Sequence, residues 1–238
     1  MERARVLIAG ALSIASCAVV SPPPVLALHE PVLHPEPGAV SVVASGGGGG
    51  GVFTREFAGG TGGIGYQATR TVAVGLAGGG GKAIAADGGD ELTLIGFGRA
   101  HVSVRPEAAR WVAFRAGLGG GGADSGLGYL TGDLGLSFGH TFADRVRIYG
   151  GPAFAVSAPF REGEALAHDS LESPRHPGLT LYGLGVVGVA VRLVDRLDLS
   201  VEAAGAWGGD GESDSITAGA VIGGLRWTTG GLAGKRVD

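Results

Sequence analysis

The residues best suited to chemistry lie close together on one short segment. His101 and Ser103 are separated by a single residue, and Glu107 follows shortly after them. In an extended strand, residues two positions apart share a face, so the imidazole and the hydroxyl would lie side by side. A histidine that removes the proton of a serine hydroxyl creates a nucleophile for acyl transfer. The pair therefore makes an acyl hydrolase one candidate function.

A second set of polar residues alternates with apolar residues along several segments. Arg192 and Asp198 flank a short turn at Asp195, which places them opposite each other as a cross-strand ion pair. Such a set could relay protons or ions, or it could simply satisfy a polar interior, and we expect the second role. The charged members are Arg99, Arg115, Asp133, Arg147, Arg192, Asp198 and Glu202.

The alternation itself predicts extended strands with one apolar and one polar surface. It is clearest from residue 130 to 141, where Leu134 and Phe138 fall on one side and Asp133 and Ser137 on the other. Most of the predicted strands exceed the roughly 5 to 6 residues of an average strand and reach the roughly 9 to 11 of a tilted membrane strand. We predict eight strands, at residues 64–79, 90–105, 110–121, 126–142, 145–158, 178–194, 196–208 and 215–229.

Strands of this kind can span a membrane only as a closed barrel, because every backbone polar group must be paired inside lipid. The expected fold is therefore all-β, a closed antiparallel up-and-down transmembrane barrel of eight strands, with ten as the alternative. The charged residues must then face the interior, since each would cost a few kcal/mol against lipid. Eight strands leave an interior just wide enough for side chains, so we expect no open pore.

Connection lengths and aromatic residues also indicate a membrane barrel. The short turns at 106–109, 143–144 and 195 contrast with the longer connections 80–89, 122–125, 159–177 and 209–214. Aromatic girdles gather at strand ends in such barrels. Trp111, Phe142 and Trp227 lie near the short turns, and Phe160, Tyr182 and Trp207 lie near the longer connections. The alternative is a soluble β-sandwich with these aromatic residues in its core.

The N-terminal segment reads as an export signal. Residues 1–16 have a basic start and an apolar run, and the run ends in small residues before Cys17, the chain's single cysteine. This resembles the lipobox of bacterial lipoproteins, which implies lipid attachment at Cys17 and, with Ala18 following, permits sorting to the outer membrane. The alternative is an ordinary signal cut after Ala27.

Residues 17–63 are predicted to form a lipidated tether rich in proline and glycine. Six consecutive glycines at 46–51 cannot hold regular structure by themselves, although residues 39–57 could supply an extra strand or strand pair. The predicted barrel then covers residues 64–229, and a short tail covers residues 230–238.

Over residues 64–229 the chain resembles small bacterial outer-membrane barrels of the OmpA and opacity-protein type. Those proteins usually end on an aromatic residue, whereas here Trp227 is followed by a glycine-rich tail. His101 and Ser103 also resemble the histidine and serine of outer-membrane lipid A deacylases, with Val104 in place of that family's asparagine. The expected polar face turns both side chains into the lumen, away from a lipid substrate.

Composition narrows the expected partners. A net charge of −4 and a pI near 5.9 argue against nucleic acid, which requires clustered Lys and Arg. We identify no cofactor and no metal site. Outer-membrane lipid is the expected surrounding, and an extracellular ligand would meet the longer connections, chiefly residues 161–176. The expected function is a structural or surface-interaction role in the outer membrane, with the acyl hydrolase and a periplasmic lipoprotein carrying a soluble β-sandwich as alternatives.

Overall fold

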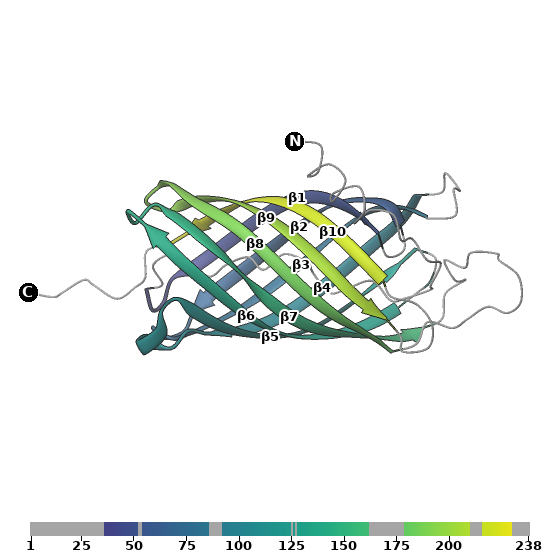
Figure 1. The fold of residues 1–238 in the computed structure, drawn as a ribbon, viewed down its shortest axis with the longest axis horizontal. Helices are drawn as coiled ribbons and strands as arrows, with labels where there is room; N and C mark the ends of the chain where they lie inside the picture. The colour runs from purple at the N-terminus through teal and green to yellow at the C-terminus, as the bar shows by residue number, and fades with distance from the viewer. Residues whose placement is uncertain are drawn as a thin grey trace, which may run out of the picture.

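The computed structural model describes residues 36–51, 54–85, 92–124, 126, 128–161, 179–209 and 216–229. Within these residues the strands form a single closed antiparallel barrel in which each strand pairs with its sequence neighbours, and the last strand pairs with the first (Figure 1). The strands are β1 (Val40–Gly51), β2 (Thr54–Gln67), β3 (Val72–Ala85), β4 (Leu92–Val104), β5 (Val112–Ala123), β6 (Gly128–Phe142), β7 (Val146–Arg161), β8 (Thr180–Val194), β9 (Leu197–Gly209) and β10 (Ile216–Thr228). A 3-10 turn, η1 (Glu107–Ala109), follows β4.

The predicted number of eight strands is wrong, because the described residues form ten. Strands β1 and β2 come from the stretch that the sequence analysis assigned largely to the tether. The predicted strand 64–79 is divided between β2 and β3 by a tight turn, in which the backbone N–H of Ala68 donates to the carbonyl of Val72. The other seven predicted strands lie within three residues of β4 to β10.

The strand conformation of the glycine run was not predicted, because it depends on pairing with strands that are distant in the sequence. Gly46 pairs with Gly223 of β10 on one side and with Gly60 of β2 on the other. The same row of glycines continues through Gly80, Gly96, Gly122 and Gly128. A glycine loses more backbone entropy than other residues when it is fixed in a strand. The ladder hydrogen bonds on both sides nevertheless hold it in place, because a membrane offers the backbone no other partners.

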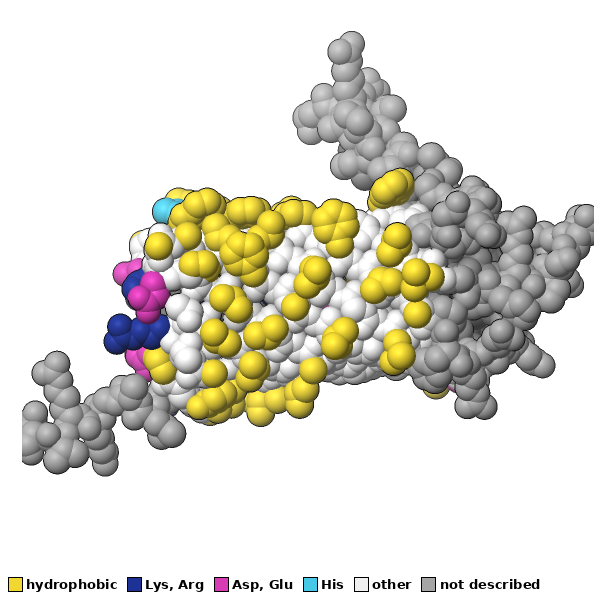
Figure 2. Space-filling model, turned by 90° about the horizontal axis from the view of Figure 1, so that it is seen from below, with side chains coloured by type: hydrophobic (Ala, Val, Ile, Leu, Met, Phe, Trp, Pro, Cys, Tyr) yellow, Lys and Arg dark blue, Asp and Glu magenta, His cyan; other side chains and the backbone are white. Residues whose placement is uncertain are grey.

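The barrel exposes its apolar side chains and buries its charges. Leu134 and Val201 are 64% and 51% exposed, whereas Glu202 is only 2% exposed. Among the strand residues whose side chains are described, Lys82 is the one Asp, Glu, Lys or Arg on the outward face. Figure 2 shows a flank covered by hydrophobic side chains, with charged ones gathered at the end that carries the short turns. A single closed sheet with this polarity rules out the two-sheet sandwich with an aromatic core.

An aromatic girdle surrounds the short-turn end. Trp111, Phe142 and Trp227 all face outward and are about half exposed, and Trp111 stacks on Phe138 with ring centroids 6.0 Å apart. Tyr182 differs from the expectation for a girdle residue, because its ring faces the lumen and is 2% exposed. The described residues contain no helix with the length and hydropathy to cross a membrane.

Candidate functional site

The structure places the seven predicted interior charges on the inner face of the barrel. Arg99, Arg115, Arg147, Asp198 and Glu202 are buried, and the side chains of Asp133 and Arg192 are 10% and 22% exposed. They come from β4, β5, β6, β7, β8 and β9, and in each strand their neighbours in sequence face outward or end the strand. Strand alternation therefore concentrates these charges in the lumen.

Arg99 and Asp133 form a two-pronged ion pair that crosses a strand. Arg99 Nε donates to Asp133 Oδ2 at 2.7 Å, and its Nη2 donates to Oδ1. The two residues belong to β4 and β6, on either side of β5, where Gly117 pairs in register with Asp133 and with His101. A Cβ atom at Gly117 would lie 2.4 Å from Arg99 Nε and 2.6 Å from Asp133 Oδ2. The missing side chain thus opens the space through which the pair forms.

Adding one methyl group at this point is expected to disrupt the pair. Gly117→Ala should lower the free energy of unfolding by about 1 to 3 kcal/mol, because overpacking forces neighbouring side chains out of position. Equilibrium unfolding by urea in detergent micelles would measure the loss. Gly98→Ala is the matched control, since a Cβ there meets nothing within 4 Å. Equal stability of the two variants would contradict the role of Gly117.

The same arrangement recurs between β7 and β9. The hydroxyl of Tyr149 donates to Glu202 Oε1 at 2.6 Å, and both side chains are buried. Gly188 of β8 lies between them, and a Cβ atom there would lie 2.6 Å from Tyr149 Cζ. Tyr149 was not among the predicted site residues, although its position two residues after Arg147 places it on the same polar face.

Arg192 and Asp198 are direct partners in the register of β8 and β9, with Nε and Oδ1 3.6 Å apart. Asp198 also pairs in register with Arg226 of β10. Arg226 was not among the predicted site residues, although it lies between the outward-facing Leu225 and Trp227. That alternation was the available signal. Asp198 therefore has an arginine on each neighbouring strand.

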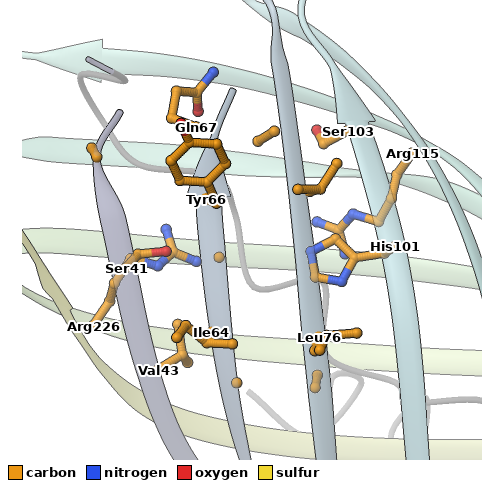
Figure 3. A pocket seen from close by; sticks show the side chains of 16 residues that line it. Ser41, Val43, Ile64, Tyr66, Gln67, Leu76, His101, Ser103, Arg115 and Arg226 are labelled. Carbon is orange, nitrogen blue, oxygen red and sulfur yellow. The ribbon is translucent and has the colours of Figure 1, made fainter. Parts of the chain in front are cut away.

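His101 and Ser103 both face the lumen from β4. They line one cavity with Gln67, Arg115 and Arg226 (Figure 3). His101 Nδ1 is buried and has no hydrogen-bond partner among the described residues, and no described hydrogen bond joins it to Ser103. Glu107 lies in η1 and is exposed. A serine and histidine enclosed in this way do not face the lipid, so the geometry lacks the access that a lipid acyl hydrolase needs.

Several predicted features lie outside the described residues. These are Cys17 with the segment before it, and most of the connection 161–176. Within the described part, no group of three or more His, Cys, Asp or Glu residues is arranged to hold a metal ion.

The inward charges and outward apolar residues of this closed ten-stranded sheet define the class of protein as a transmembrane-type β-barrel. No family model matches the chain, and no curated protein matches it. Among solved structures, it is similar to the outer-membrane protease OmpT from Escherichia coli, with 13% identity, coverage of 80% of this chain and 96% of OmpT, and a TM-score of 0.43.

Two further solved structures are also similar to it. The attachment invasion locus protein Ail of Yersinia pestis has 11% identity, coverage of 82% and 100%, and a TM-score of 0.35. Neisserial surface protein A has 10% identity, coverage of 79% and 95%, and a TM-score of 0.34.

Proposed function

We propose that this chain is a bacterial outer-membrane β-barrel protein with a structural or surface-interaction role and no open pore. The apolar exterior, the closed sheet and the aromatic girdle are what a bilayer requires of a spanning strand protein. Lipid attachment at Cys17 is part of this proposal and rests on the sequence alone.

The observation that carries the absence of a pore is the burial of side chains inside the lumen. Thr180 and Ser157 are 0% exposed, and Tyr129 and Tyr182 are 2% exposed, although all four face the barrel interior. A water-filled channel along this wall would leave these four side chains exposed to solvent. The rings of Tyr129 and Tyr182 are instead enclosed by neighbouring atoms. They lie on β6 and β8, the strands that also carry Asp133 and Arg192.

A surface-interaction role would belong to the connections between strands. The barrel wall is committed to lipid on one side and to paired polar groups on the other, so a partner outside the cell would have to meet the connections between strands. We assign this contact to the longer connections, chiefly residues 161–176.

Conductance measurements test the proposal of a closed lumen. The purified protein in planar lipid bilayers is expected to give no stable current steps. Tyr129→Gly combined with Tyr182→Gly removes the two largest fully buried side chains and is expected to produce current, because the lumen then holds an unfilled passage. Trp207→Gly is the control, because the Trp207 side chain is 65% exposed on the outer face. This variant is expected to give no current. Steady open channels in the parent protein would refute a closed lumen.

A further inference from the structure

The described lumen contains more positive than negative charge. Its carboxylates are Asp133, Asp198 and Glu202. Its guanidinium groups on the strands are Arg99, Arg115, Arg147, Arg192 and Arg226. However these groups are connected, three carboxylates cannot neutralise five guanidinium ions. Charges inside a barrel wall are poorly screened, so the remaining positive charge favours the entry of an anion.

One cavity concentrates this excess at the short-turn end of the barrel. Its volume is about 60 Å³, and it is partly open to solvent. Figure 3 shows Arg226 of β10 on one side and Arg115 and His101 on the opposite side, all directed into the space between them. None of the residues that line the cavity is Asp or Glu.

The cavity exists because the inward side chains of one wall of the barrel are mostly small. Between Arg226 on β10 and His101 on β4 run β1, β2 and β3, whose inward positions here are mostly small: Val43, Gly63, Gly65, Ala73 and Ala77, besides Ser41 and Gln67. Ser41 and Ser103 add hydroxyl groups around the space, and the amide of Gln67 donates to the carbonyls of Thr69 and Val72 in the adjoining turn. Ser103 and Gln67 are each 6% exposed, so these polar groups belong to the interior and not to the barrel surface.

We propose that this cavity is a binding site for a small oxyanion, of the phosphate or carboxylate class, that enters from the side of the short turns. Guanidinium groups bind such anions through parallel N–H···O bonds, which chloride cannot accept in the same way. Hydroxyl and imidazole N–H groups complete a set of donors around the anion. The site goes beyond the proposed structural role and does not depend on it.

The strongest test uses inorganic phosphate and a change at Arg226. Isothermal titration of the purified full-length protein in detergent, at constant ionic strength, is expected to show saturable binding of phosphate. Arg226→Gln should weaken this binding at least tenfold, and Arg226→Lys should weaken it less, because the charge remains while the two-pronged geometry is lost. Arg145→Gln is the matched control, since that arginine is exposed in the turn between β6 and β7.

A second substitution and a second anion complete the experiment. Arg115→Gln and Ser41→Ala change the cavity from other strands, so a folding failure at Arg226 still leaves a test, with heat-modifiable migration as the check of folding. Titration with acetate determines whether a carboxylate suffices. Absence of saturable binding of both anions by the parent protein, or equal binding by the Arg226→Gln and Arg145→Gln variants, would overturn the proposal. Neither result would bear on the conductance measurement.

Discussion

Leu134→Arg is expected to lower the free energy of unfolding by about 2 to 4 kcal/mol, because it presents a charge to the middle of the lipid-facing band. Leu134 lies near the centre of β6, is 64% exposed, and has Ala116 and Phe154 as its neighbours across the sheet. In a soluble protein an exposed leucine tolerates such a change. The predicted loss therefore depends on the outer face contacting hydrocarbon, and urea unfolding in lipid vesicles would measure it.

The matched control places the same charge at a different depth. Phe142 is on the same outward face of β6, at the short-turn end, and is 49% exposed. Phe142→Arg should cost only about 0 to 1 kcal/mol, because the penalty falls toward the membrane interface. If both arginine variants unfolded at the same urea concentration as the parent protein, the proposed position of the membrane along the barrel would be wrong.

The sequence predicted the strands that carry regular alternation. From β4 to β10, apolar residues such as Leu134 and Val201 recur at every second position, and the strand ends lie beside recognisable turns. Strand β1 shows this alternation only from Val40 to Ser45, before its glycine run, and β2 falls inside a predicted strand only from residue 64 onward. Gly46–Gly51 has no side chains whose polarity could alternate, so its strand conformation is a property of its partners, Gly223 and Gly60 among them. Pairing between distant strands cannot be inferred from a glycine run.

The polar interior was predictable only residue by residue. Parity within a strand identifies which side a residue faces, and a tight turn fixes the register of Arg192 with Asp198. The pairs that cross a strand are different, because Arg99 reaches Asp133 only if the registers of β4, β5 and β6 together place Gly117 between them. A one-residue shift in any of the three would remove the contact.

The cavity likewise could not be predicted from the sequence, because it forms where the wall has few large inward side chains. Small inward residues on β1 to β3 leave space that the large side chains of β4, β5 and β10 border. Arg226 and Arg115 are far apart in the chain, and they line one space only because β10 pairs with β1 to close the barrel. A barrel without β1 and β2 would lack the wall of this cavity, so predicting the cavity also requires the correct number of strands.

Asp133→Leu is expected to be the most damaging single substitution in the lumen, with a loss of about 3 to 5 kcal/mol in the free energy of unfolding. It leaves the guanidinium of Arg99 buried without its two-pronged partner, and an uncompensated buried charge is far more costly than a missing ion pair. Urea unfolding followed through the fluorescence of the exterior tryptophans, such as Trp111 and Trp227, would measure this loss.

The double variant Asp133→Leu with Arg99→Met separates the two effects. Removing both charges is expected to recover most of the stability, because desolvation of an ion pair offsets much of its attraction and apolar side chains of similar size can fill the same space. Arg192→Met is the matched control, since its contact with Asp198 is longer, at 3.6 Å, and its side chain is more exposed than that of Arg99. Its loss should be clearly smaller. Losses in the double variant that equal the sum of the two single variants would mean that Arg99 and Asp133 contribute independently, and the ion pair would then not be what stabilises this part of the lumen.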